Sequence, residues 1–277
     1  MRPQPRRVLM VDPEYFDVAY AINPHMEGQI GKVDRKKART QWEALKGAYE
    51  KIGLNVVVLP AVKGLPDMVF AANQSFPFLG PRGEKNVFLS QMATKEREPE
   101  VAYFEQWYRK EGYAVHVLQT SAPFEGMGDL VWHPDQKMLW GGFGFRTDAQ
   151  VYEEIGQTVE VPVQGLKLVN PDFYHLDTCL APLRDGVALY YPKAFDASGL
   201  KLLKTHFNDL IEVPKNEALQ GFACNGHCPD GRHVLLQKGS AVTCRSLRAR
   251  GFEPVELETS EFLKSGGSVF CLKMMVY

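Results

Sequence analysis

The chain has almost no net charge and no long apolar run. Its 277 residues include 33 acidic and 32 basic side chains, so the formal net charge is −1. Proteins that bind nucleic acid or an acidic membrane surface carry a basic excess on at least one face. Neither partner is therefore expected here. No stretch approaches the roughly 18 uninterrupted apolar residues of a membrane-spanning helix.

Cysteines are few, and a secretion signal is not recognisable. A chain of this length with 45% hydrophobic residues can bury a core without disulfides. An odd number of cysteines, five, fits free thiols in a reducing compartment. The basic N-terminal segment leads into only four apolar residues, 8–11, which is too short for a signal peptide. We expect a cytoplasmic protein.

A phosphate-binding glycine loop and an interdomain linker are also missing. The apolar segment 8–11 runs into Asp12 and Pro13 instead of G-x-G-x-x-G, so a dinucleotide-binding fold loses its main support. No segment rich in proline and serine divides the chain. Residues 1–277 are therefore predicted to form one domain.

Five segments share one pattern, a helix end followed by a strand. Charged residues lead to a residue suited to closing a helix, and a β-branched or alternating run follows. The five closing residues, spaced roughly 50 residues apart, are Gly53, Gly112, Gly156, Asn208 and Gly251. Two further apolar strands are expected before the next helix, for example at 68–70 and 87–89. Five such units in series favour a ring of α/β units over a doubly wound sheet.

Side chains capable of chemistry recur at similar places in these units. Asn73, His175 and Cys271 follow the closing residues of their units by 19 or 20 residues, and Glu125 follows Gly112 by 13. In a ring, equivalent positions converge on one axial mouth. We therefore expect these four side chains to be neighbours.

Cys271 is the candidate nucleophile. It lies six residues from the C-terminus, on a predicted short apolar strand that follows Gly266 and Gly267. A chain end usually frays, so a thiol here indicates that the tail enters the fold. Tandem glycines allow close approach to a ligand and expose N–H groups. The alternative is a cysteine that only fills the core.

A reacting thiol must become a thiolate, so it needs a base or a cation nearby. His175 is the candidate base, with Asp177 on the same side of a predicted extended segment. Glu125, in a glycine-rich turn with Asp129, could orient His175 or bind a cation. The alternatives are a structural histidine and ordinary turn carboxylates.

Carboxylates around a cysteine and a histidine, with no adjacent lysine in these motifs, predict a planar cationic substrate. A guanidinium fits, because its N–H donors match carboxylates and its charge would help to stabilise a thiolate. Arg146, among glycines and aromatics, is the candidate partner for a substrate carboxylate, or else a surface arginine.

The segment 224–228 offers a rival site. Cys224, His227 and Cys228 could bind zinc, but structural zinc takes four ligands, usually from two clusters, and no second cluster accompanies them. We predict no metal and leave the role of these three residues open. A non-catalytic module that binds a small molecule or a metal is the alternative from another class.

The motifs together resemble the guanidino-group-modifying branch of the pentein superfamily. Those that carry the resemblance are residues 20–26, 66–73, 124–129, 142–147, 175–178 and 260–272. Each motif alone is weak, but the ordered combination covers nearly the whole chain and is specific.

The resemblance implies an α/β fold, a pentein five-bladed ββαβ propeller with pseudo-fivefold symmetry. It also implies a site of Cys271, His175 and Glu125 that needs no cofactor. By family analogy Cys271 attacks the guanidinium carbon and His175 protonates the departing amine. The covalent intermediate then passes to water or to an amine acceptor. Members include arginine deiminases, dimethylarginine dimethylaminohydrolases, amidinotransferases and arginine dihydrolases.

The choice among these activities depends on Asn73. Deiminases and dimethylargininases usually carry an acidic residue at or beside this position to hold the guanidinium, whereas the dihydrolase group resembles this chain in having Asn. An amide accepts from a guanidinium N–H and also donates to a ureido oxygen, so bound citrulline could be attacked again. We predict an arginine dihydrolase giving ornithine, carbon dioxide and ammonia. Dimethylargininase, deiminase and amidinotransferase activities are the alternatives.

Further substrate contacts are expected from Asp177, Asn23 and Asp129, although the last two could equally cap turns or helices. The expected partner is a small guanidino compound. The sequence leaves the oligomeric state open, a homo-oligomer included.

Overall fold

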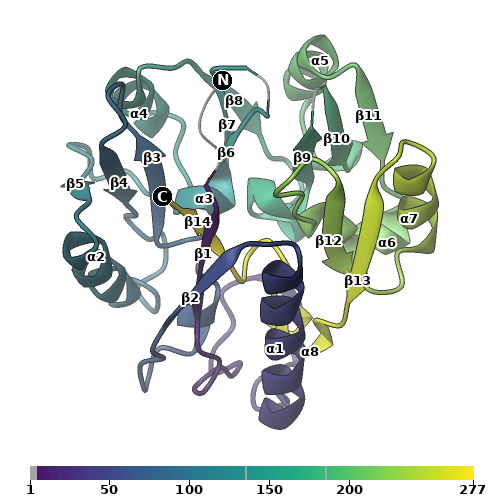
Figure 1. Ribbon diagram of the computed structural model, residues 1–277, viewed down its shortest axis with the longest axis horizontal. Helices are drawn as coiled ribbons and strands as arrows, with labels where there is room; N and C mark the ends of the chain where they lie inside the picture. The colour runs from purple at the N-terminus through teal and green to yellow at the C-terminus, as the bar shows by residue number, and fades with distance from the viewer. Residues whose placement is uncertain (1–4, 135, 185) are drawn as a thin grey trace.

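The computed structural model describes residues 5–134, 136–184 and 186–277, in which strands and helices alternate (Figure 1). Five long helices in these residues each connect two parallel strands of one sheet. They are α1 (Arg35–Lys51), α2 (Glu100–Lys110), α4 (Val151–Val159), α5 (Ala197–His206) and α7 (Ala241–Arg248). The repeated unit is therefore a mixed α/β unit, as the sequence predicts.

Five small sheets occur in the described residues, four with three strands and one with two. In sheet order, their strands are β14 (Met274–Val276), β1 (Arg7–Val11) and β2 (Asn55–Leu59); β3 (Ser75–Leu79), β4 (Lys85–Leu89) and β5 (Ala114–His116); β6 (Leu130–Trp132), β7 (Leu139–Phe143) and β8 (Val163–Lys167); β11 (Asp209–Glu212), β10 (Val187–Tyr190) and β9 (Leu180–Arg184); and β12 (His233–Gln237) with β13 (Glu253–Leu257). Each middle strand pairs antiparallel on one side and parallel on the other.

The two-stranded sheet is extended by a short segment that pairs with it through a single β-bridge. An isolated antiparallel bridge joins His227 to Leu235 of β12, while β12 pairs parallel with β13. The segment around His227 thus takes the place that a first strand holds in the other sheets.

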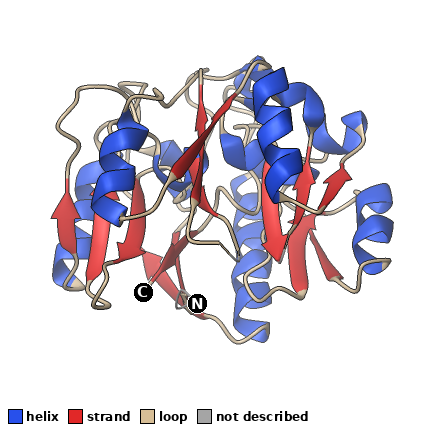
Figure 2. Cartoon of the chain, turned by 90° about the horizontal axis from the view of Figure 1, so that it is seen from above, coloured by secondary structure: helices blue, strands red, loops and turns tan. Residues whose placement is uncertain are grey.

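The sheets follow one another around the middle of the molecule, with α2, α4, α5 and α7 at its periphery (Figure 1). The two ends of the described chain meet in one sheet, because β1 pairs antiparallel with β14 and Arg7 lies opposite Val276. Figure 2 shows the short strands of the separate sheets with the helices beside them. The tail thus enters the fold, as the position of Cys271 predicts.

Three of the predicted helix ends are confirmed. The residues with positive φ two or three positions after the ends of α1, α2 and α7 are Gly53 at 83°, Gly112 at 80° and Gly251 at 78°. The other two predicted caps are wrong. Gly156 lies inside α4, which continues because Val159 packs in the core, and Glu160 ends it with a φ of 58°. Asn208 follows α5 without a positive φ.

The strand predicted at 68–70 is also wrong. Pro66 opens a 3-10 helix, Pro66–Val69, because proline has its φ preset for the first turn of a helix. The strand begins instead at Ser75, in β3. Asn73 therefore lies on the connection between this 3-10 helix and β3.

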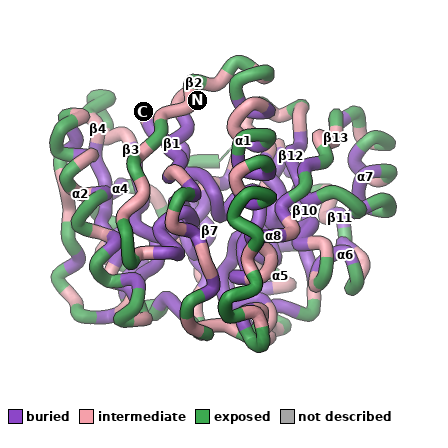
Figure 3. Tube along the Cα trace, turned by 90° about the horizontal axis from the view of Figure 1, so that it is seen from below, coloured by how far each residue is buried: buried purple, intermediate pink, exposed green. Residues whose placement is uncertain are grey.

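The core lies between the strands and the inward faces of the helices (Figure 3). In α1 the buried apolar side chains are Ala38, Trp42, Leu45, Ala48 and Tyr49, spaced three or four residues apart on one face. The remaining described helices are short: α3 (Gly126–Asp129), α6 (Lys215–Leu219), α8 (Ser260–Leu263) and 3-10 turns. Among the residues described, none of the helices has the length and hydropathy needed to cross a membrane.

Candidate active site

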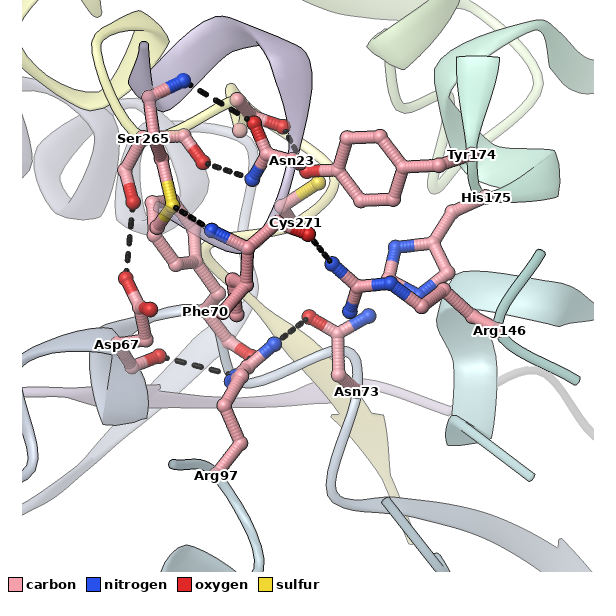
Figure 4. A pocket seen from close by; sticks show the side chains of 14 residues that line it. Asn23, Asp67, Phe70, Asn73, Arg97, Arg146, Tyr174, His175, Ser265 and Cys271 are labelled. Atoms are coloured by element: carbon pink, nitrogen blue, oxygen red, sulfur yellow. Dashed lines mark hydrogen bonds between the residues drawn. The ribbon is translucent and has the colours of Figure 1, made fainter. Parts of the chain in front are cut away.

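One pocket collects most of the predicted site residues (Figure 4). Five of them line it: Asn23, Asn73, Arg146, His175 and Cys271. Asp67, Arg97 and Tyr174 complete its polar wall. The free volume is only about 10 Å³, room for roughly one water molecule, so the structure is closed over the pocket.

Cys271 lies in the turn between α8 and β14, not on the strand that we predict from the apolar run. The strand starts only at Met274, because residues 268–272 form hydrogen-bonded turns instead of a ladder. The thiol is buried and has two polar partners. It donates to Oδ2 of Asp177 over 3.1 Å, and Nδ2 of Asn225 donates to Sγ over 3.2 Å.

Asn225 fixes this turn, and our reading of the sequence did not identify it. Its Oδ1 accepts from the backbone nitrogens of Phe270 (3.0 Å) and Cys271 (3.3 Å). Its Nδ2 also donates to the backbone oxygen of Asp177 over 2.9 Å. An asparagine offers both an acceptor and a donor, so one side chain links the Cys271 turn to the Asp177 loop. The only signal in the sequence was its place inside the unusual 224–228 segment.

The resting thiol is protonated. Burial, followed by the nearby Asp177 carboxylate, raises the pKa of Cys271 well above its ordinary value. Burial also raises the pKa of Asp177 to about 7, opposed by the hydrogen bond from Cys271 and by the charge of Lys273. Oδ1 of Asp177 is buried without a hydrogen-bond partner among the described residues. A cation placed beside these two groups would favour both ionised forms.

Glu125 joins His175 to Arg146. Nε2 of His175 donates to Oε2 of Glu125 over 2.7 Å, and Nη1 of Arg146 lies 3.1 Å from the same oxygen. Burial acts to raise the pKa of Glu125, but the Arg146 charge and the His175 hydrogen bond hold it well below its ordinary range. Glu125 is therefore an ionised carboxylate that orients the imidazole.

His175 does not lie on an extended segment with Asp177, contrary to the sequence prediction. It precedes the 3-10 helix Leu176–Thr178, because the backbone turns there and Thr178 donates back to the backbone oxygen of His175. The two side chains consequently have different partners: His175 meets Glu125, and Asp177 meets Cys271.

Asn73 lies between Arg97 on one side and His175 with Arg146 on the other (Figure 4). Nη1 of Arg97 donates to Oδ1 of Asn73 over 2.9 Å, whereas Nδ2 of Asn73 is buried without a partner in the described chain. Arg97 is itself fixed by Glu100 over 2.9 Å. Our sequence analysis did not identify Arg97, which lies in an ordinary-looking charged run.

The glycines of the motifs make room for this arrangement. A Cβ on Gly128 would collide with Nδ2 of Asn73 and come within 3.5 Å of the His175 ring. Gly266 has a φ of +81°, and a Cβ there would lie 2.8 Å from the hydroxyl of Tyr174. Glycine is needed at these two positions because a Cβ at either one would collide with a side chain that lines the pocket.

The two remaining residues that were predicted to contact substrate are hydrogen-bonded to other parts of the protein. Asn23 lines the pocket, but its amide accepts from the backbone nitrogens of His25 and Met26 and donates to the backbone of Ser265. Asp129 lies outside the lining, where its two oxygens accept from Leu176 and Thr147. Both therefore hold loops in place, and their roles as substrate contacts stay predictions that this geometry does not support.

The residues of the 224–228 segment have separate surroundings. Cys224 is fully buried in the core, whereas His227 binds the hydroxyl of Tyr49 through Nδ1 over 3.0 Å. Cys228 lines a different cavity and is partly exposed. Within the residues that the structure describes, no three histidine, cysteine or carboxylate side chains are grouped as a metal site would require.

Comparison with known proteins gives close relatives over the whole fold. The family model of eukaryotic N,N dimethylarginine dimethylhydrolase matches residues 13–277. The dimethylarginine dimethylaminohydrolase of Mycobacterium tuberculosis is 38% identical over 99% of this chain and 87% of its own. The bifunctional arginine dihydrolase/ornithine cyclodeaminase AgrE of Nostoc is 38% identical over 98% of this chain, but the match spans only 38% of AgrE.

A solved structure shows the same fold. The substrate-bound N-terminal domain of ArgZ, described as an arginine dihydrolase from the ornithine–ammonia cycle in cyanobacteria, has a TM-score of 0.91 and 36% identity, with 97% of both chains covered. The mixed α/β architecture and the resemblance drawn from the motifs are thereby confirmed. The chain belongs to the dimethylarginine dimethylaminohydrolase family of guanidino-group-modifying pentein proteins.

Proposed function

We propose that this protein is an arginine dihydrolase, a hydrolase that converts arginine to ornithine, carbon dioxide and ammonia through a covalent intermediate on Cys271. The main support is the arrangement of Cys271 against Asp177, with His175 and Glu125 as a second pair and Asn73 between them and Arg97. The likeness to the N-terminal domain of ArgZ supports the choice of substrate.

The first step depends on the charge of the substrate. The guanidinium group of arginine places its N–H donors against Asp177, whose Oδ1 lacks a partner in the described chain. Its positive charge lowers the cost of ionising Cys271, so the thiolate forms only when substrate is present. Sγ then attacks the guanidinium carbon, and the thiol proton leaves with the departing amino group as ammonia, delivered by His175.

Water completes the first round. His175, oriented by Glu125, takes a proton from a water molecule that attacks the thiouronium carbon. The carbon–sulfur bond breaks and citrulline forms. Every group used is a side chain of this chain or water, and no cofactor enters these steps.

Asn73 is proposed to allow a second round. Its unpartnered Nδ2 can donate to the ureido oxygen of citrulline, whereas a carboxylate would repel that oxygen. Cys271 attacks the ureido carbon, the bond from that carbon to Nδ breaks, and ornithine leaves as the amine with a proton delivered by His175. Water then cleaves the carbon–sulfur bond of the S-carbamoyl intermediate and releases carbamic acid, which gives carbon dioxide and ammonia, while the thiol is restored. The balance is arginine and two waters to ornithine, carbon dioxide and two ammonia molecules.

Arg146 is proposed to hold the substrate carboxylate. Its Nη2 donates to the backbone oxygen of Ile22 over 2.8 Å, and its guanidinium lies 4.8 Å from the Tyr174 ring centroid. Arginine cannot enter the closed pocket, so the segment that carries Ile22 and Asn23 must move to admit it. That movement would free one N–H of Arg146 for the carboxylate.

We also propose that the five sheets close into a five-bladed propeller and that residues 1–277 form a single catalytic domain. Support comes from the pairing of β1 with both β2 and β14, which joins the beginning and the end of the described chain in one unit.

The test is incubation of the protein separately with L-arginine, with asymmetric dimethylarginine, and with L-arginine plus glycine. Products are identified by mass spectrometry. Ornithine from L-arginine, absent with Cys271→Ala, is the expected result. Citrulline from asymmetric dimethylarginine alone would instead support a dimethylargininase, and guanidinoacetate from the glycine mixture an amidinotransferase. Unchanged substrate in all three reactions would refute the proposal.

A further inference from the structure

A second and much larger cavity lies among the inner strands. Its volume is about 470 Å³, and it shares no lining residue with the pocket of Cys271. Each of the five sheets contributes to its wall: Met275 from β14, Pro77 from β3, Val131 from β6, Pro182 from β9, and His227 from the bridge to β12. Cavities of this volume are of the size that holds small molecules.

Lys273 lines this cavity. The residue is fully buried, and its Nζ has no hydrogen-bond partner among the residues described. Nζ lies 3.2 Å from the centroid of the Phe270 ring, and the Asp177 carboxylate attracts it electrostatically without a hydrogen bond. An ammonium held away from water without a hydrogen-bond acceptor is costly, so such a group indicates an absent hydrogen-bonding partner.

The charges around the cavity favour an anion. Arg6 at the exposed rim adds a second cation, while the guanidinium of Arg184 is engaged with backbone oxygens of Gly231 and Arg250. Asp230 lines the exposed side but is held by His233. Tyr277 also lines the cavity, where its backbone oxygen accepts from the Tyr113 hydroxyl. No described acidic side chain is bonded to Lys273.

The walls indicate what kind of anion fits. Much of the lining is apolar and includes Met127, Val131, Trp132, Phe270 and Met275, with the Phe270 ring against Nζ of Lys273. A single ammonium is a point charge with no fork of donors, which suits one carboxylate better than a multiply charged phosphate. The volume left beyond that charge suits an apolar body packed on the aromatic rings.

We propose that this cavity is a second ligand site, which binds a small monocarboxylate with an apolar or aromatic body, its carboxylate paired with Lys273. The site is separate from the catalytic pocket although Lys273 is only two residues from Cys271, because the two side chains line different cavities. The inference does not depend on which guanidino compound the catalytic pocket takes.

Methionines provide local reporters for a test. Met127 and Met275 line the second cavity, and Met26 lines the catalytic pocket. The full chain is labelled with methyl-¹³C methionine, and methyl spectra are recorded during titration with 3-phenylpropionate. The uncharged isostere 3-phenylpropionamide is titrated as the matched control, and Lys273→Leu removes the ammonium.

Saturable shifts of the Met127 and Met275 methyl signals with 3-phenylpropionate are expected, with the Met26 signal unmoved. The amide and the Lys273→Leu variant should each bind about tenfold more weakly or worse, since a charge-assisted hydrogen bond is lost. Absence of saturable shifts, shifts confined to Met26, or equal affinity for acid and amide would each overturn the proposal. The comparison of 3-phenylpropionate with 3-phenylpropionamide tests the proposed carboxylate site even if Lys273→Leu fails to fold.

Discussion

Nη1 of Arg97 donates to Oδ1 of Asn73 over 2.9 Å, and this contact fixes which end of the amide is left for a ligand. The amide nitrogen stays unpartnered among the described residues, beside the His175 ring (Figure 4). A donor at this position suits a ureido oxygen, while the carbonyl oxygen keeps a second lone pair for a guanidinium N–H.

Replacing Asn73 with aspartate should therefore change the product and not only the rate. A carboxylate removes the donor and repels the ureido oxygen, so citrulline should leave before a second attack. We expect the ratio of citrulline to ornithine to rise at least about tenfold, measured by mass spectrometry at equal arginine conversion. Asn55→Asp, at the exposed start of β2, is the matched control. An unchanged ratio in Asn73→Asp would remove Asn73 from the explanation.

Cys271→Ala should abolish turnover while leaving arginine binding nearly intact. Alanine removes the nucleophile but keeps Asp177 and Arg146, so kcat should fall by more than about 10³-fold and the Kd for arginine should change only a few-fold. Calorimetry measures the Kd for arginine, and a discontinuous product assay measures kcat. Cys244→Ala, on α7 and outside the pocket lining, should behave like the unmodified protein. Residual turnover in Cys271→Ala comparable to the control would exclude covalent catalysis.

The pH profile of kcat/KM should have an acid limb that follows the ionisation of Asp177. Burial raises the pKa of this carboxyl to about 7, and guanidinium binding needs its ionised form. The value of kcat/KM should therefore rise about tenfold per pH unit below pH 7 and level off above it. In Asp177→Asn the limb should disappear and kcat/KM should fall about 10²-fold or more. Persistence of the same limb in the variant would assign it to another group.

Glu125→Gln should impair chemistry more than binding. The amide keeps the size of the side chain but loses the charge that orients His175 and pairs with Arg146. We expect kcat to fall by about 10² to 10⁴-fold with a much smaller change in KM. Glu111→Gln, which breaks the partly exposed ion pair with Arg7, is the control and should leave kcat unchanged. Equal losses in both variants would point to a general loss of folding.

Lys273→Leu should stabilise the fold in a pH-dependent way. Burial lowers the pKa of Lys273 to about 7, opposed by the charges of Asp177 and Cys271. Between pH 7 and the unfolded value near 10.4, the unfolded chain binds a proton that the folded chain lacks, so the stability of the unmodified protein rises with pH. The variant should gain about 1–4 kcal/mol in the free energy of unfolding at pH 7, and less as the pH approaches 10. Urea denaturation at several pH values measures this, and a gain that grows with pH would contradict it.

Much of the architecture could be predicted because it is written in local signals. The glycines at 53, 112 and 251 follow their helices with positive φ, and the recurring pattern indicated a series of similar α/β units. The predictions failed where packing between distant segments overrides the local sequence pattern. Gly156 lies within a helix because Val159 extends the packed face, and Pro66 turns an apolar run into a 3-10 helix.

Several residues of the candidate site could be identified from the sequence, but the hydrogen bonds and ion pairs between them could not. Glu125, His175 and Cys271 stand in glycine-rich motifs that local reasoning can find, whereas Arg97 and Asn225 look ordinary in sequence. Asn225 acts across 46 residues of chain to bind Cys271, and such contacts exist only after the sheets assemble. For the same reason the sequence did not show that the segment 224–228, considered as a rival zinc site, supports the Cys271 turn through Asn225.

The central claim is that Cys271 attacks the guanidino carbon of arginine twice, first in arginine and then in citrulline. The measurement that tests it most directly is ¹³C nuclear magnetic resonance of the protein with arginine labelled on the guanidino carbon, combined with an ammonia assay. The account predicts that the label ends in carbon dioxide and bicarbonate, with ornithine formed and two ammonia molecules released per arginine. Label that stays in citrulline, with one ammonia per arginine, would contradict it and leave a single hydrolysis as the activity of this site.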